Sequence, residues 1–192
     1  MAAEPHNAAP ATLEVTASLE VTASPEVTAS PATAVIAALT ERKLTIAVAE
    51  SLTGGLLVAS LVAVPGASKV VLGGVVAYNT AIKASVLGVD RTLLESRGAV
   101  DPDVATQMAS GVRTALAVDG RPADIGIATT GVAGPDTQDG KPVGTAFIGI
   151  ATAEGVVSIE LAMSGDRDTI RSGVVSECLV ELTRLLSRTA GF

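Results

Sequence analysis

The chain has 192 residues, of which 48% are hydrophobic and 17% charged, and its formal net charge is −7. This composition excludes wholesale disorder, and the length suits a single domain with a sizeable core. The acidic balance and the low aromatic content, 2%, argue against direct nucleic-acid binding, which uses basic stripes and stacking platforms.

The sequence carries no mark of export or of membrane insertion. Its start lacks a basic region followed by an apolar block, and the longest mostly apolar stretch, residues 56–64, is too short to cross a bilayer. Cys178 is the only cysteine, which forbids an intrachain disulfide and fits a reducing compartment. We therefore expect a cytoplasmic protein without membrane contact.

Residues 1–30 differ in composition from everything that follows. They contain the repeat LEVTAS, LEVTAS, PEVTAS over residues 13–30 and carry glutamates but neither lysine nor arginine. We predict a flexible low-complexity extension over residues 1–30 and one domain over residues 31–192. The alternative is a docking segment, because alternating Leu, Val and Ala could add to a sheet edge.

From Pro31 onward the pattern alternates between helices and strands. In chain order we predict helix 32–42, strand 44–49, helix 54–64, strand 70–77, helices 79–87 and 90–97, a helix opening at 101–103, strand 123–129, the hairpin strands 145–152 and 156–163, and a last helix from residue 166. Helices between apolar strands predict a three-layer α/β/α domain, and the late hairpin predicts a mixed sheet. Chemistry in such folds gathers in loops after strands.

The first such loop is residues 50–55, between a strand and a helix. Gly54 and Gly55 would let a substrate approach the backbone, and a helix start offers free N–H groups to an anion or an oxyanion. The hydroxyls of Ser51 and Thr53 add a possible nucleophile. The plainer interpretation is that Ser51 or Thr53 only caps the helix.

The second loop precedes the helix at 79–87. If Asn79 caps this helix, Tyr78 and Lys83 occupy the two positions that pack together in a hydrophobic staple. An amine in the first turn also feels the positive end of the helix dipole, which favours its neutral, basic form. The alternative is a tyrosine lying on a lysine stem at the surface.

Two later loops complete the candidates. Residues 130–144 are rich in Gly and Pro and include Asp136 and Asp139, which could hold a divalent metal, although Lys141 weakens that interpretation. Arg167 and Arg171 lie four residues apart at a helix start, where they suit a phosphate or form surface ion pairs. The only histidine lies in the extension, so a nucleophile in the domain would be a hydroxyl with a Lys, Tyr or carboxylate base.

These loops, in this order, resemble one known family. The matching segments are AES-x-TGG (49–55), VPGAS (64–68), GGVVAYNTAIK (73–83), LGV (87–89), GAV (98–100), TGVAGPD (130–136), KPVGT (141–145) and SGDRD-x-x-R (164–171). Together they resemble the C-terminal domain family of competence/damage-inducible protein CinA, which includes the PncC-type nicotinamide-nucleotide amidohydrolases. The resemblance covers residues 33–188.

The resemblance implies deamidation of nicotinamide mononucleotide to nicotinic acid mononucleotide and ammonia, a step of pyridine-nucleotide recycling, without a metal or cofactor. It places the catalytic group at Ser51, Tyr78 and Lys83. We expect substrate binding by Thr53, Gly54, Gly55, Thr130, Gly131, Arg167 and Arg171. Our hypothesis for the mechanism has backbone N–H groups near 53–55 facing the oxyanion and the two arginines holding the 5′-phosphate. A homo-oligomer, most simply a dimer, is expected from the resemblance alone.

The sequence departs from the family pattern at three places. Leu52 stands where the family usually has Cys, Asp101 stands where it usually has Ser, and residues 137–140 lack its usual glycine pair. Leu52 removes a possible cysteine nucleophile and favours Ser51. The alternative function is a non-catalytic nucleotide-binding or protein-interaction module related to competence or DNA damage.

Overall fold

The computed structural model describes residues 30–188 and contains one five-stranded sheet. Its strands are β1 (Ile46–Glu50), β2 (Val71–Val76), β3 (Ile125–Gly131), β4 (Thr145–Ala151) and β5 (Val156–Ala162), in the order β2-β1-β3-β4-β5. The strands β2, β1 and β3 run parallel, whereas β4 and β5 join antiparallel. The predicted mixed sheet and its terminal hairpin are therefore confirmed.

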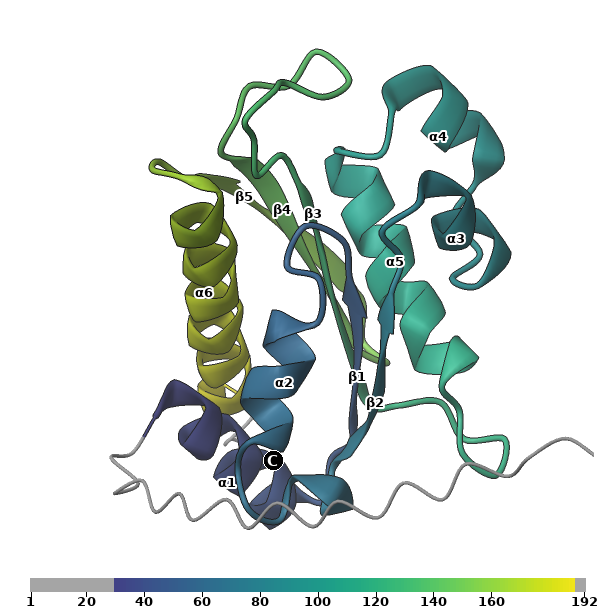
Figure 1. Ribbon diagram of the computed structural model, residues 1–192. Coiled ribbons are helices and arrows are strands. Elements are labelled where there is room, and N and C mark those ends of the chain that lie inside the picture. The colour runs from purple at the N-terminus through teal and green to yellow at the C-terminus, as the bar shows by residue number, and fades with distance from the viewer. Residues whose placement is uncertain (1–29, 189–192) are drawn as a thin grey trace, which may run out of the picture.

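Helices cover both faces of this sheet (Figure 1). One face carries α1 (Pro31–Arg42), α2 (Leu56–Val62) and α6 (Arg167–Arg188), and the other carries α3 (Thr80–Ser85), α4 (Arg91–Arg97) and α5 (Pro102–Ala115). A short 3₁₀ turn, η1 (Ala67–Lys69), leads into β2. The three-layer α/β/α architecture predicted from the sequence is thus confirmed.

Each face of the sheet has its own apolar core. On one side α6 buries a stripe of side chains at four-residue spacing: Ile170, Val174, Cys178, Leu182 and Leu186. On the other side α5 buries Val104, Met108 and Val112. A fully buried side chain of this size contributes roughly 1.5–3 kcal/mol through the hydrophobic effect, so these stripes hold both helix layers to the sheet.

The helix α5 lies unusually close to the strands beneath it. A side chain at Gly126 in β3 would overlap the carbonyl oxygen of Ala109, and one at Gly149 in β4 would overlap that of Ala105. Glycine at these two positions therefore sets the distance between α5 and the sheet. This contact fixes the strand ends, and the loops that follow them, relative to the α5 layer.

Most helix starts agree with the sequence. The side chains of Ser30, Asn79 and Asp101 accept backbone N–H bonds as N-caps of α1, α3 and α5. Several boundaries differ by one or two residues: for example, α2 begins at Leu56, two residues late, and β3 continues through Gly131 because it pairs with β4. The predicted extension falls largely outside the described residues. No helix within residues 30–188 has the length and apolarity to span a bilayer.

Candidate active site

A cavity of about 260 Å³ opens at the edge of the sheet where β1 and β3 end. Its walls come from five separate parts of the chain: Ser51, Leu52, Tyr78, Thr80, Lys83, Ala99, Val100, Thr130, Gly131, Val132, Ala133, Gly134, Asp136, Gln138 and Arg167. The carboxyl ends of parallel strands are the usual position of sites in open α/β sheets. The cavity therefore lies where the fold predicts chemistry.

Ser51 and Lys83 meet in the wall of this cavity. Ser51 directly follows β1 and is held by its N–H, which donates to the carbonyl oxygen of Thr129 at 3.0 Å. Lys83 lies in α3, behind the cap formed by Asn79, and its Nζ is 2.9 Å from Ser51 Oγ. The same Nζ donates to the carbonyl oxygen of Ala77 at 2.6 Å. The hydroxyl and the amine are thus at proton-transfer distance.

The environment of Lys83 favours its neutral form. The side chain is only 1% exposed, and burial lowers the pKa of its amine from 10.5 to about 8. The sequence predicted a lowered pKa for Lys83, and this direction is confirmed. Its cause is burial of the amine rather than the helix dipole. No carboxylate forms an ion pair with Lys83 among residues 30–188, so nothing of that kind restores the charged state. A neutral lysine beside a serine is the arrangement of a base and its nucleophile.

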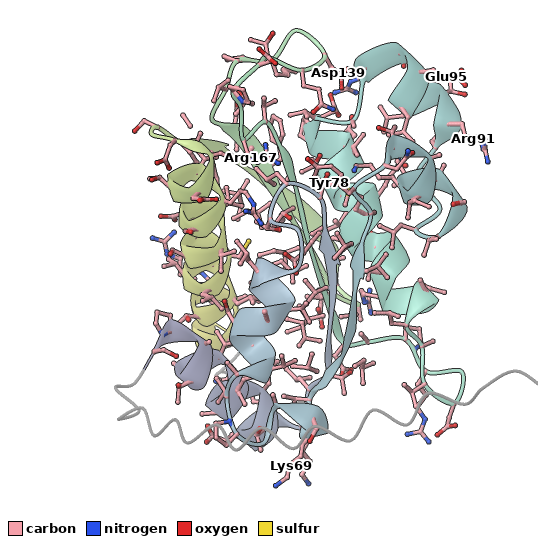
Figure 2. All side chains as sticks on the ribbon, in the orientation of Figure 1. Lys69, Tyr78, Arg91, Glu95, Asp139 and Arg167 are labelled. Atoms are coloured by element: carbon pink, nitrogen blue, oxygen red, sulfur yellow. The ribbon has the colours of Figure 1, made fainter. Side chains whose placement is uncertain are left out.

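Tyr78 occupies the position before the cap, as predicted, but its hydroxyl has another partner. The side chain is 62% exposed, and its oxygen accepts a hydrogen bond from Arg167 at 3.0 Å. Arg167 also donates to the carbonyl oxygen of Gly134 at 2.7 Å. Figure 2 labels Tyr78 beyond β2 and Arg167 at the start of α6. The described residues contain no hydrogen bond between Tyr78 and Lys83; the catalytic role of Tyr78 stays a prediction.

The loop after β1 is organised by a side chain that the sequence analysis did not single out. Glu50, only 1% exposed, accepts the N–H groups of Gly55, Leu57 and Val58 at 2.9–3.1 Å. The N–H groups at the start of α2 are therefore capped by a buried carboxylate that precedes the helix. A carboxylate just before a predicted helix start was the available signal, because acidic groups stabilise helix N-termini.

This cap changes what residues 53–55 can do. The N–H of Gly54 donates to the carbonyl oxygen of Ser51 and that of Gly55 to Glu50, so neither is free for an oxyanion, and this part of the expected role is corrected. Thr53, Gly54 and Gly55 also lie outside the cavity lining, and the Thr53 hydroxyl bonds that of Thr129. Within residues 30–188, the free N–H groups of this loop are those of Leu52 and Thr53.

The two arginines of α6 have different surroundings. Arg171 donates from Nε to the carbonyl oxygen of Leu52 at 3.0 Å and from a terminal nitrogen to that of Thr53 at 3.1 Å, and it pairs with Asp168. It lies outside the cavity lining, whereas Arg167 forms part of it. Arg171 therefore braces the loop that carries Ser51, and Arg167 is the arginine that faces the cavity.

The remaining predicted residues lie at the end of β3. Thr130 and Gly131 both line the cavity, and the Thr130 hydroxyl donates to the carbonyl oxygen of Ala99 at 2.7 Å. Asp136 lines the cavity, whereas Asp139 binds the backbone of Ala99. Residues 30–188 contain no group of three His, Cys, Asp or Glu side chains suited to a metal ion.

Known proteins agree with this architecture. The CinA C-terminal domain family matches residues 28–186. A CinA-like protein from Frankia casuarinae is 48% identical over 153 residues, which are 80% of this chain and 34% of that protein. A putative competence-damage inducible protein from Geobacillus sp. is 52% identical over 134 residues, 69% of this chain and 31% of that protein. The chain thus spans about a third of the length of these relatives.

Solved structures give the same result. A CinA superfamily protein from Klebsiella pneumoniae has a TM-score of 0.77 and 30% identity, over 82% of this chain and 96% of that chain. A competence/damage inducible protein from Agrobacterium tumefaciens has a TM-score of 0.75 and 34% identity, over 81% and 93%. Since the family match spans most of the sequence and the fold agrees, the chain belongs to the CinA C-terminal domain family.

Proposed function

We propose that this site hydrolyses the carboxamide of nicotinamide mononucleotide to nicotinic acid mononucleotide and ammonia, with Ser51 as the nucleophile and Lys83 as its base. One observation carries the proposal: the Lys83 amine lies 2.9 Å from Ser51 Oγ, with a pKa lowered by burial to about 8. A serine hydroxyl attacks poorly unless a neighbouring base takes its proton. At pH 7 such a lysine is neutral about a tenth of the time, which suffices for a general base.

The proton follows a closed path between these two residues. Lys83 takes the hydroxyl proton as Ser51 Oγ bonds to the carboxamide carbon, and it returns that proton to the nitrogen when the carbon–nitrogen bond breaks. Ammonia leaves, and an ester remains on Ser51. Water then attacks the ester while Lys83 again accepts a proton, which finally restores the serine hydroxyl. The carbonyl of Ala77 accepts one N–H of Lys83 at 2.6 Å and so orients the amine throughout.

The negative oxygen of the tetrahedral intermediate needs hydrogen-bond donors. The N–H groups of Leu52 and Thr53 have no protein acceptor within residues 30–188 and directly follow the nucleophile. The N–H of the residue after a nucleophilic serine is a recurrent oxyanion donor, and one such donor contributes about 2.7–4 kcal/mol. We assign this role to the N–H of Leu52, which lines the cavity, in place of Gly54 and Gly55.

The phosphate of the nucleotide needs a cation that is not already neutralised. Arg167 lines the cavity and, within residues 30–188, forms no ion pair with a carboxylate. Its two assigned hydrogen bonds, to Gly134 and Tyr78, use neutral oxygens and leave other N–H groups for an anion. We propose that Arg167 binds the 5′-phosphate and that Tyr78 steadies its guanidinium.

A second candidate function is nucleotide binding without turnover. The exposed Tyr78, bonded to Arg167 rather than to the amine, favours this candidate because the expected three-residue catalytic group is not assembled. The competence and damage names of the relatives describe those proteins and give no reaction. The two functions differ in one measurable property, the release of ammonia.

Ammonia release from nicotinamide mononucleotide by the purified chain tests the proposal. We expect turnover by the unmodified chain and a loss of about 10³-fold or more in Ser51→Ala, whose protein remains folded. Ser60→Ala is the matched control, since the Ser60 hydroxyl lies in α2 and bonds only the helix backbone, at Leu56. Tight binding of the nucleotide without ammonia release would establish the second candidate, and undiminished turnover by Ser51→Ala would exclude the proposed nucleophile.

A further inference from the structure

One wall of the cavity is a loop that carries a tight turn. Residues 138 and 141 face each other across the turn Asp139–Gly140, in which both residues have positive φ, 52° and 72°. Asp136 and Gln138 precede the turn, line the cavity and are exposed. Neither side chain has a hydrogen-bond partner within residues 30–188, so both are available to a bound molecule.

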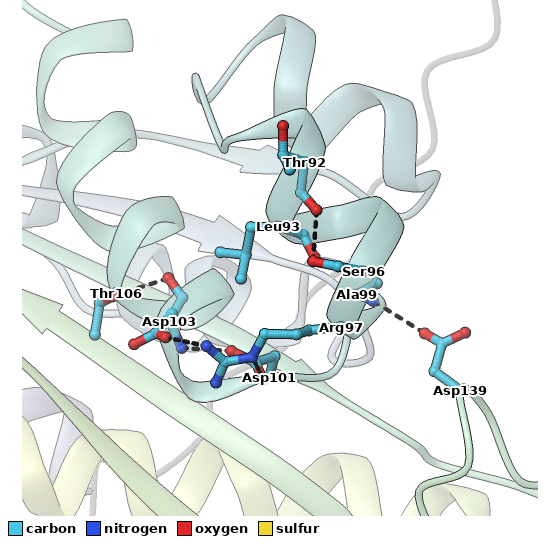
Figure 3. A network of polar contacts seen from close by, with 9 residues as sticks. All are labelled: Thr92, Leu93, Ser96, Arg97, Ala99, Asp101, Asp103, Thr106 and Asp139. Atoms are coloured by element: carbon cyan, nitrogen blue, oxygen red, sulfur yellow. Dashed lines mark hydrogen bonds and ion pairs between the residues drawn. The ribbon is translucent and has the colours of Figure 1, made fainter.

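The carboxylate of Asp139 ties this loop to Ala99, which also lines the cavity. It accepts the N–H of Ala99 at 2.9 Å, as the dashed line in Figure 3 shows. Gly98 leaves room for the contact, because a Cβ there would lie 2.5 Å from the Asp139 carboxylate and its φ is +77°. The carbonyl of Ala99 is meanwhile held by Thr130 at 2.7 Å. Ala99 thus joins the loop to the end of β3.

The turn that contains Ala99 is itself held by ion pairs. Arg97 donates to Asp101 at 2.9 Å and to Asp103 at 2.6 Å, and Asp101 caps α5 (Figure 3). These contacts lie on either side of Ala99 in the sequence and hold the turn between α4 and α5. The Ala99 N–H, which Asp139 accepts, is therefore held in place by contacts on both sides of it in the sequence.

A second turn of the same kind shows that the carboxylate is not needed for the turn itself. Asp119 and Gly120 have φ values of 51° and 73°, and residues 118 and 121 face each other in the same way. The Asp119 carboxylate has no hydrogen-bond partner within residues 30–188. Asp-Gly alone supports this two-residue turn. The contact from Asp139 to Ala99 is consequently an additional feature of the loop at the cavity.

We infer that Asp139 is a positioning residue for the nucleotide: by binding the Ala99 N–H, it holds Asp136 and Gln138 where they meet the ribose hydroxyls. The inference rests on the proposed function, because it concerns recognition by the same cavity. Neighbouring hydroxyls can donate to a carboxylate and exchange hydrogen bonds with an amide, which suits these two side chains. Asp139 itself lies outside the cavity lining and acts only through the loop.

Three variants of the full chain test the inference. Asp139→Gly keeps the turn and removes the carboxylate, Asp139→Asn keeps an acceptor, and Asp119→Gly is the matched control in the second turn. We expect Asp139→Gly to raise KM for nicotinamide mononucleotide about fivefold to tenfold, with kcat within about twofold. Asp139→Asn restores most of the affinity, and Asp119→Gly leaves both constants unchanged. Hydrogen exchange at the Ala99 amide, faster only in Asp139→Gly, reports the broken contact independently of turnover.

The outcomes separate this inference from the proposed function. Calorimetry of nicotinamide mononucleotide on the Ser51→Ala background measures binding without chemistry. Weaker binding after Asp139→Gly supports the inference even where the unmodified chain releases no ammonia, which would overturn the proposed function alone. Faster exchange at Ala99 with unchanged KM and affinity overturns the inference alone. Equal losses in Asp119→Gly also overturn it, and no binding to any variant overturns both.

Discussion

The charge state of Lys83 decides whether this residue can act as a base toward Ser51. Sequence spacing predicted that Lys83 lies on a helix capped by Asn79 and that its pKa is lowered, and both are confirmed, although α3 is so short that Lys83 lies in its last turn. The cause could not be predicted, because the burial of Lys83 results from tertiary packing, which brings its amine to Ser51 in the loop after β1, rather than from local sequence. The same holds for its partner: the position of Lys83 on its helix does not reveal that Ser51 Oγ lies 2.9 Å away.

The pH dependence of the reaction follows from that pKa. Lys83 acts as a base only after losing its proton, so kcat/KM should rise about tenfold per pH unit below the pKa and level off above it. With a pKa of about 8, the bend should lie near pH 8. Initial rates of ammonia release between pH 6 and 9.5 provide the measurement, with circular dichroism as the control for folding. A rate that is constant or falls over this range would contradict a lysine base.

At the scale of elements, the loop between β1 and α2 shows what sequence patterns leave out. The strand and the helix were predicted, but Glu50 folds back onto the helix start, and α2 begins at Leu56 rather than at Gly54. The pattern of apolar residues locates elements because it reports burial. It does not report which side chain satisfies the free N–H groups of a helix start, so it could not reveal that the N–H groups of Gly54 and Gly55 are already bonded.

Replacement of Glu50 tests the internal cap. Glu50→Gln removes the charge and places an amide hydrogen against the N–H groups that the carboxylate now accepts. We expect a loss of about 2–4 kcal/mol in the free energy of unfolding, since bonds to a buried charged acceptor are stronger than neutral ones. Urea unfolding with an unchanged m-value measures it, and Glu41→Gln on the exposed side of α1 is the control. Equal stability of both variants would show that the cap is dispensable.

The two arginines of α6 give a second test at this scale. Arg167→Met should lower kcat/KM for nicotinamide mononucleotide about tenfold to a hundredfold and change that for nicotinamide riboside, which lacks the phosphate, less than about threefold. Arg171→Met removes the bonds to Leu52 and Thr53, so it should affect both substrates alike and destabilise the fold by about 1–3 kcal/mol. Steady-state rates with both substrates and urea unfolding distinguish the two roles. A loss confined to nicotinamide mononucleotide in Arg171→Met, with equal losses for both substrates in Arg167→Met, would instead assign the phosphate to Arg171 and the support of the loop to Arg167.

At the scale of the whole molecule, the alternation of elements predicted the layers and the mixed sheet, because each element must bury an apolar face. It could not predict that residues 97–101 and 130–139 meet in the wall of one cavity. Those contacts join segments that are distant in the sequence and depend on how closely α5 packs on the sheet. The expected homo-oligomer stays a prediction, and the role of the extension lies outside the described residues.

Mass spectrometry of the chain quenched with acid during turnover of nicotinamide mononucleotide can detect the proposed ester on Ser51. We expect a transient adduct on the peptide that contains Ser51, with the mass of the substrate less ammonia. This adduct should be absent from Ser51→Ala and should disappear when the substrate is exhausted. Ammonia release that continues in Ser51→Ala, with no adduct on the unmodified chain at any time, would contradict Ser51 as the nucleophile.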